Sequence, residues 1–254
     1  MHTRGIMSEY EKTIHIYDDK IGRVQYISHM GSDLTVVNSA RVSFGNEKSR
    51  LDRRDRKLIK YLVGHKHTST LEHCLITYKF VVPLYIRSQH HRHRTWSYNE
   101  ISRRYTEKDL QFYCPHQFRT QHKSNRQASN PEELIDPYLW HDGETEIVRA
   151  FHPPASESYK EHCMRSLRFF EELVRKGVCR EQARGVLPQT LYTEYYGTVN
   201  LNNLLKFVSL RLHDGAQWEI QKVAEACLEI ATDLFPCTVG AYSDNTGLSK
   251  VSKR

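Results

Sequence analysis

Apolar and polar residues alternate along the chain with two different periods, and each period predicts one kind of element. Between residues 75 and 82 every second residue is apolar, which is typical of a half-buried strand, and Pro83 ends it. Shorter apolar runs at 24–28 and 110–114 predict two more strands. Elsewhere hydrophobic residues recur every three or four positions, as on the buried face of a helix. This spacing, with its capping residues and prolines, predicts helices at 32–41, 55–63, 84–93, 159–176, 180–187, 200–212 and 218–235.

Three polar segments lie between or beside these elements. Residues 1–20 are expected to be a loosely held lead-in, and the tail after Gly240 is polar. Residues 116–154 are rich in prolines and amides, which predicts an excursion of loops and short helix. The sequence contains no glycine-rich strand–turn–helix fingerprint of a dinucleotide-binding unit. We therefore expect one domain over residues 1–254, with an α/β architecture of the α+β type and no Rossmann motif.

Composition and charge narrow the functional classes. The chain has 254 residues, of which 39% are hydrophobic and 26% charged, as in globular proteins. A net charge of +7 favours anionic ligands, whether nucleotides, nucleic acid or a membrane surface. The six cysteines lie far apart without a CxxC pair, which indicates reduced thiols. No apolar run is long enough to span a bilayer and no targeting segment is recognisable, so we expect a soluble, cytoplasmic protein.

The chemistry concentrates between residues 89 and 105, which read QHHRHRTWSYNEISRRY. This stretch holds four arginines and three histidines but a single acid, Glu100. Arginines that cannot neutralise one another indicate an external phosphate or carboxylate, which the guanidinium group binds at two points. A solvated basic face is the simpler alternative. Trp96 and Tyr98 favour a ligand, because they interleave aromatic surface with the charge and suit a molecule with phosphates and flat rings.

The same stretch resembles a known family. Arg92-His93-Arg94 is followed after seven residues by Ser102, with Arg104-Tyr105 behind it, and this spacing is similar to the signature of the flavin-dependent thymidylate synthases. The resemblance implies an antiparallel sheet packed with long helices, and a homotetramer with active sites shared between subunits. It also implies reductive methylation of dUMP to dTMP with FAD as cofactor, methylenetetrahydrofolate as carbon donor and NADPH as reductant. In such a family the flavin is held by side chains at a subunit junction.

The resemblance assigns roles to individual residues. Arg211 is the expected catalytic cation, since ionising N3 of the uracil makes C5 nucleophilic without a protein cysteine. On the predicted helix it stands on or beside the apolar stripe, where an unpaired guanidinium is costly unless it faces an anion or a pocket. The expected dUMP ligands are Gln89, Arg92, Glu100, Ser102, Arg104, Arg184 and Arg211. The expected FAD ligands are Ser43, His67, Ser69, Glu72, Arg92, His93, Arg94, Glu100, Asn200 and Lys206. Lys206 departs from the histidine or asparagine that is common in the family at this position.

Three other hypotheses compete with this one. The net charge and the arginine-aromatic stretch also suit a nucleic-acid-binding module, although no motif of that class is present and we expect no nucleic-acid or membrane partner. Three histidines and Glu72 between residues 65 and 73 suggest a metal site, but their spacing is not that of a zinc helix, so we expect none. Cys114, before Pro115, suggests the unrelated cysteine-dependent thymidylate synthases, yet a cysteine there is more often a small apolar residue.

Overall fold

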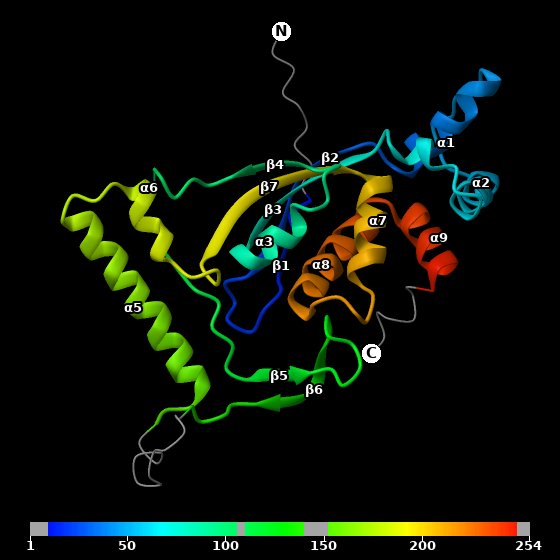
Figure 1. The fold of residues 1–254 in the computed structure, drawn as a ribbon. Helices are drawn as coiled ribbons and strands as arrows, with labels where there is room; N and C mark the ends of the chain where they lie inside the picture. Colours follow the sequence, from blue (N-terminus) through cyan, green and yellow to red (C-terminus); the bar gives the residue numbers. More distant parts are fainter. Residues whose placement is uncertain (1–9, 106–109, 140–151, 248–254) are drawn as a thin grey trace.

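The computed structural model describes residues 10–105, 110–139 and 152–247, and its centre is a five-stranded sheet (Figure 1). Every pair of neighbouring strands is antiparallel. This confirms the expected α/β fold with an antiparallel sheet. The strands lie in the order β1 (Thr13–His15), β2 (Arg23–Met30), β3 (Leu75–Pro83), β7 (Tyr192–Asn200) and β4 (Ser97–Glu100).

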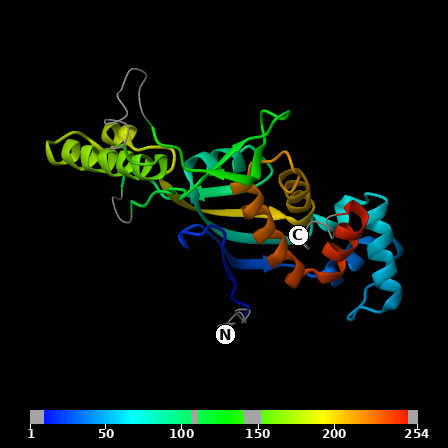
Figure 2. The same cartoon turned by 90° about the horizontal axis from the view of Figure 1, so that it is seen from below.

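Helices cover one face of the sheet and extend beyond both of its ends (Figure 2). The covering helices are α3 (Leu84–His90), α7 (Leu201–Arg211) and α8 (Trp218–Leu234). One end carries α1 (Asp33–Arg41), α2 (Arg53–Gly64) and α9 (Pro236–Thr246), with the short turns η1 (Val42–Phe44) and η2 (Thr68–Leu71). The other end carries α5 (Ala155–Arg175), α6 (Arg180–Ala183) and the turn η3 (Arg184–Val186). No helix in the described ranges is both long and apolar enough to cross a membrane.

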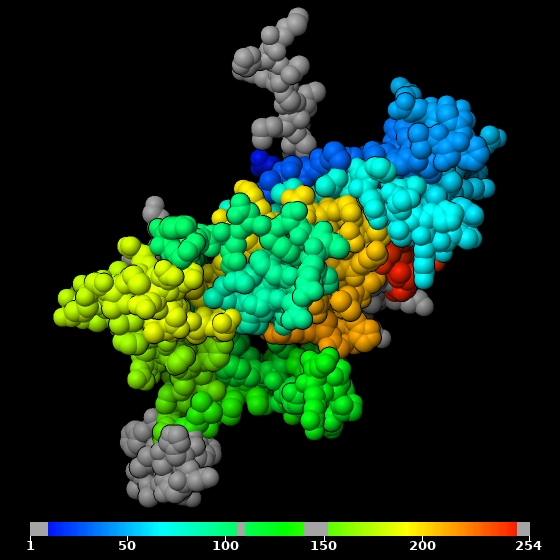
Figure 3. Space-filling view, turned by 45° about the horizontal axis from the view of Figure 1, so that its top comes forward, coloured from blue at the N-terminus to red at the C-terminus, as the bar shows by residue number. Residues whose placement is uncertain are grey.

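The space-filling view shows that both ends project from the central body (Figure 3). A hairpin of β5 (Phe118–Gln121) and β6 (Ser129–Ile135) forms a second, two-stranded sheet and lies beside the start of α8. Its tip approaches the α7–α8 connection, because a Cβ atom on Gly215 would stand 3.2 Å from Nδ2 of Asn125. The hairpin therefore borders the same connection that follows Arg211.

The sheet centre is packed with rings. The alternating residues of β3 that the sequence pattern predicts to be buried are fully buried: Ile76, Tyr78, Phe80 and Val82. Opposite them, Gly197 of β7 has no room for a side chain, since a Cβ atom there would stand 2.9 Å from Phe80 and 3.2 Å from Trp96. Only glycine lets β7 pass this close to both rings.

Several strand predictions need correction. The predicted strand at 110–114 is wrong: its only ladder contact within the described residues is an isolated bridge from Phe112 to Leu191. β7 carries only a weak apolar pattern, with Thr193 and Gly197 on its buried face, and was not predicted. β1 lies within the expected loose lead-in, β4 in a segment for which no strand was predicted, and β5–β6 within the 116–154 excursion. Residues 140–151 of that excursion lie outside the described residues.

The helix predictions hold better because they rest on period and caps together. The amphipathic segments around α1, α2, α5, α7 and α8 are all helical, and Oδ1 of Asn200 accepts the backbone N–H of Asn203 as the predicted cap of α7. The predicted helix at 84–93 ends at His90, and that at 180–187 is α6 followed by a 3₁₀ turn. The tail after Gly240 is helical as far as Thr246, and residues 248–254 lie outside the described residues.

A buried carboxylate joins the first and last described helices. Asp33, at the start of α1, is 4% exposed. Its oxygens accept the backbone N–H groups of Cys237 (2.8 Å) and Thr238 (2.9 Å) and the Thr238 hydroxyl (2.6 Å). Phe235 at the N-cap of α9 has no acceptor side chain and Pro236 has no N–H, so Asp33 supplies the cap from a distant part of the chain.

Candidate active site

The arginine stretch leaves α3 and crosses a platform of aromatic rings before entering β4. His90 and Trp96 are buried at the two ends of this loop, with ring centroids 4.5 Å apart. The Tyr98 hydroxyl lies 2.8 Å from the carbonyl of His90 and 3.2 Å from that of His93, and it donates to this pair. These hydrogen bonds of the Tyr98 hydroxyl hold the backbone between α3 and β4 in place. Arg92 and Arg94, in contrast, are exposed, and neither forms an ion pair within the described part of the chain.

His93 and Arg211 meet although 118 residues separate them. Nε of Arg211, at the end of α7, donates to Nε2 of His93 over 3.1 Å. Burial, and then the positive charge of Arg211, lowers the pKa of His93 to about 4. Burial also lowers the pKa of Arg211. His93 is therefore a neutral acceptor at physiological pH, and it orients the guanidinium without cancelling its charge. No carboxylate in the described residues pairs with Arg211.

Gln89 contacts the same α7–α8 connection by a second side-chain bond. Its amide nitrogen donates to Oε1 of Gln217, the N-cap residue of α8. Nε2 of Gln217 donates in turn to Glu219 over 2.9 Å. The end of α3 and the α7–α8 connection are thus joined twice, through Arg211–His93 and through Gln89–Gln217.

A second group of predicted residues lies where β4 ends. Oε1 of Glu100 accepts the Thr193 hydroxyl (2.6 Å) and Nε of Arg87 (3.1 Å). Ser102 starts a turn in which its hydroxyl accepts the backbone N–H of Arg104 over 3.3 Å. The Arg104 side chain is exposed and lies against the ring and hydroxyl of Tyr105.

The third group forms an open groove between α1 and η2. Ser43, His67 and Ser69 line it together, and its volume is about 490 Å³. The structure therefore brings three of the predicted flavin ligands into one concavity. Glu72 lies at the end of η2, where its Oε1 accepts Nδ2 of Asn202 on α7 over 2.9 Å.

The remaining predicted residues lie apart from these groups. Lys206 is exposed on α7 and has no ion pair among the described residues. Arg184 is exposed at the start of η3, next to α6. α6 and the groove-bearing α1 lie at opposite ends of the sheet (Figures 1 and 2). One chain alone thus does not bring Arg184 and the groove together.

Comparison with known proteins shows the family to which this chain belongs. A family model described as thymidylate synthase complementing protein matches residues 25–237. The chain belongs to this family. It is 38% identical to the flavin-dependent thymidylate synthase of Thermus thermophilus, over 88% of this chain and 76% of the relative. It is 36% identical to that of Thermotoga neapolitana, over 87% of this chain and 90% of the relative.

A solved structure has the same fold. The UMP/dUMP methylase PolB from Streptomyces cacaoi, bound with 5-Br dUMP, superimposes with a TM-score of 0.72. It is 30% identical and covers 87% of this chain and 94% of its own. The family membership confirms the resemblance that Arg92-His93-Arg94 and Ser102 suggested.

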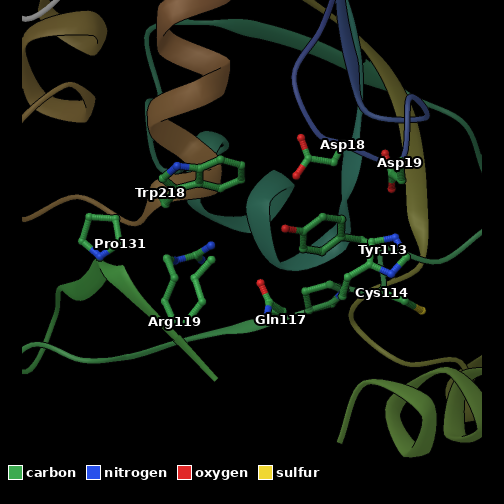
Figure 4. A pocket seen from close by; sticks show the side chains of 11 residues that line it. Asp18, Asp19, Tyr113, Cys114, Gln117, Arg119, Pro131 and Trp218 are labelled. Carbon is green, nitrogen blue, oxygen red and sulfur yellow. The ribbon is translucent and has the colours of Figure 1, made fainter. Parts of the chain in front are cut away.

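The structure bears on two of the competing hypotheses, the metal site and a nucleophilic Cys114. Within the described residues no cluster of three His, Cys, Asp or Glu side chains has the geometry of a metal site. Cys114 lines a separate pocket of about 220 Å³, which Tyr113, Arg119 and Trp218 also line (Figure 4). Burial and the nearby Cys163 thiol raise the pKa of Cys114 well above its usual value, so it is a poor nucleophile.

Sequence reasoning missed several polar residues that contact the predicted ones directly or through one intermediate residue. Arg87 and Thr193 hold Glu100, while Gln217 and Glu219 stand behind Gln89. Arg87 has a weak sequence signal, since it lies on α3, five residues before Arg92. Thr193 and Gln217 contact predicted residues that are 93 and 128 positions away, and Glu219 reaches Gln89 only through Gln217, so no local pattern marks them.

Proposed function

We propose that this protein is a flavin-dependent thymidylate synthase, a methyltransferase that converts dUMP to dTMP. The observation that carries the proposal is the pairing of Arg211 with neutral His93 beside exposed Arg92 and Arg94. Family membership and relatives named for this activity support it. The 5-Br dUMP in the PolB structure supports a pyrimidine monophosphate as the substrate.

The proposed cofactor is FAD. The described residues fit a flavin dinucleotide in two respects. Arg92 and Arg94 offer guanidinium groups without a protein anion, which suits a diphosphate. The groove of Ser43, His67 and Ser69 offers hydroxyl and imidazole groups in a concavity of about 490 Å³. The full proposed set is Ser43, His67, Ser69, Glu72, Arg92, His93, Arg94, Glu100, Asn200 and Lys206. When bound, the flavin supplies the hydride of the reductive methylation.

The proposed nucleotide site has exposed arginines at one end and a half-buried arginine at the other. Exposed arginines hold the phosphate of dUMP, since they have no competing carboxylate in the described residues. Arg211, half-buried, lies against the base and stabilises the negative charge that develops when N3 ionises. The proposed set is Gln89, Arg92, Glu100, Ser102, Arg104, Arg184 and Arg211. Methylenetetrahydrofolate is the proposed carbon donor and NADPH the proposed reductant.

We further propose that the active site is shared in a homotetramer of single-domain subunits. The groove, the arginine loop and Arg184 occupy the two ends and the middle of one chain. The exposed fractions of Val42 (72%) and Phe44 (79%), beside Ser43 in η1, support contact of this end with another subunit. A second subunit then supplies Arg184 to a site that the first leaves incomplete.

The deciding experiment is anaerobic incubation of the purified protein with dUMP, methylenetetrahydrofolate and NADPH, followed by chromatography for dTMP. We expect a yellow protein and dTMP that requires all three compounds. Omission of dUMP is the control, because NADPH oxidation alone does not report methylation. A colourless protein that takes up no added FAD, forms no dTMP and shifts RNA in a salt-dependent way would support the nucleic-acid hypothesis instead.

A further inference from the structure

Behind Gln89 lies a chain of hydrogen bonds that ends on a buried carboxylate. Gln89 donates to Gln217, and Gln217 donates to Oε2 of Glu219 over 2.9 Å. Glu219 is 3% exposed. Its other oxygen, Oε1, accepts from Nη2 of Arg119 and from the Tyr113 hydroxyl at 3.4 Å. The series therefore runs from α3 through the start of α8 to the β5–β6 hairpin.

Arg119 is itself held in place on three sides. Its Nε donates to the Ser129 hydroxyl over 3.0 Å, across the hairpin. Its guanidinium carbon lies 5.0 Å from the centre of the Trp218 ring, and Figure 4 shows the two side chains at the same pocket wall. A guanidinium group only donates, so Oε1 of Glu219 accepts from Arg119, and Oε2 is left to accept from Gln217.

The Glu219 carboxylate fixes the direction of every bond toward Gln89. A carboxylate only accepts, so Gln217 must turn its NH₂ group to Glu219 and its carbonyl oxygen to Gln89. Gln89 must then turn its own NH₂ group to Gln217. An isolated glutamine amide has two nearly equivalent orientations, related by a half turn that exchanges oxygen and nitrogen. Here one of the two is excluded, and Oε1 of Gln89 is left without a donor among the described residues.

We infer that Gln217 and Glu219 are positioning residues for the nucleotide, because they hold the Gln89 amide in one orientation. The inference rests on the proposed function, in which Gln89 is a dUMP ligand. Gln89 then offers its carbonyl oxygen and its second N–H to the nucleotide in a fixed arrangement, beside Arg211. Neither Gln217 nor Glu219 touches the substrate in this arrangement.

The test is a double-mutant cycle read by dUMP binding. In Gln217→Leu the Gln89 amide is free to rotate, and we expect a dissociation constant for dUMP about tenfold higher, or ~1.4 kcal/mol. Flavin content and kcat should stay near those of the unmodified protein, so that the effect appears in KM. In a Gln89→Ala background the same change should have no further effect on dUMP binding, since the amide that Gln217 orients is gone.

Gln221→Leu is the matched control. Gln221 is also a glutamine in the first turn of α8, and its Nε2 donates to the carbonyls of His213 and Ala216 rather than to Gln89. Its effect on dUMP binding, if any, should add to that of Gln89→Ala. Glu219→Gln provides a second variant, since it keeps the size of the side chain but allows Gln217 to turn over.

The outcomes separate the two levels of the proposal. Unmodified protein that binds no dUMP would contradict the proposed function itself. Unmodified protein that binds dUMP, with Gln217→Leu binding it equally well or losing affinity additively with Gln89→Ala, would overturn the positioning role alone.

Discussion

The buried cap that Asp33 supplies to α9 leads to a quantitative prediction. Asp33→Ala removes the acceptor for two backbone N–H groups and one hydroxyl, all at a site that is 4% exposed in the native protein. A lost cap costs about 1–2 kcal/mol, and each buried donor left unsatisfied costs about 1–3 kcal/mol before water enters the space. The loss of the negative charge at the helix N-terminus adds to this.

We therefore expect Asp33→Ala to lower the free energy of unfolding by about 3 kcal/mol. For a domain of this size that corresponds to a fall in Tm of about 6–12 °C. Asp33→Asn keeps the size and one acceptor, so its effect should be about half as large. The assay is thermal unfolding followed by circular dichroism, with all variants at one protein concentration because an oligomer unfolds in a concentration-dependent way.

Asp244→Ala is the matched control for this prediction. Asp244 lies on α9, the helix that Asp33 caps, but its ion pair with Lys60 is 3.6 Å long and both side chains are about two-thirds exposed. Exposed pairs of this kind contribute about 0–1 kcal/mol. A Tm for Asp33→Ala that falls no further than that of Asp244→Ala would refute the reasoning, because the capping bonds would then contribute nothing that water does not replace.

Four further outcomes are expected. Arg211→Ala should retain the flavin absorbance but lose dTMP formation by about 100-fold or more, as expected for a lost transition-state contact; unchanged turnover would remove Arg211 from its role. Arg184→Ala subunits mixed with Arg211→Ala subunits should recover part of the activity that each lacks alone, whereas no recovery would contradict a shared site. Cys114→Ser should keep synthase activity, and loss of turnover with flavin still bound would contradict a mechanism without a cysteine nucleophile. Because the pKa of His93 is lowered to about 4, the unfolded state binds more protons between that pH and about 6.5, so stability should rise with pH across this window; His93→Gln should flatten the dependence of Tm on pH there, and an unaltered slope would contradict it.

The sequence predicts most of the helices and two of the sheet strands, β2 and β3, and the reasons differ between elements. The helix at α7 combines a regular apolar stripe with a capping asparagine, two signals that agree. β3 alternates apolar and polar residues along its length. β7 lies between β3 and β4, yet its buried face includes Thr193 and Gly197, which carry little hydrophobic signal. Its place in the sheet follows from its partners, which local periodicity does not contain.

The residues of the candidate site also differ in how far the sequence predicts them. The motif of Arg92, His93 and Arg94 can be recognised because its residues are consecutive, and Arg211 stands out because it is a cation on an apolar stripe. The role of Gln217 and Glu219 depends on side chains that are up to 128 residues away, as between Gln217 and Gln89. Such a contact exists only once α8 packs on α3. A list of residue types therefore does not reveal it.

The bare backbone at Gly197 has a consequence for how this protein can vary. A single methyl group there would press on Phe80 and Trp96 together, and Trp96 anchors the loop that carries the guanidinium groups. The positions of those guanidinium groups thus depend on how closely the β7 backbone approaches the two rings at Gly197. A substitution that enlarges residue 197 would shift the loop that carries the guanidinium groups without changing any residue of that loop. The tolerance of the site to sequence change therefore depends on packing in the middle of the sheet.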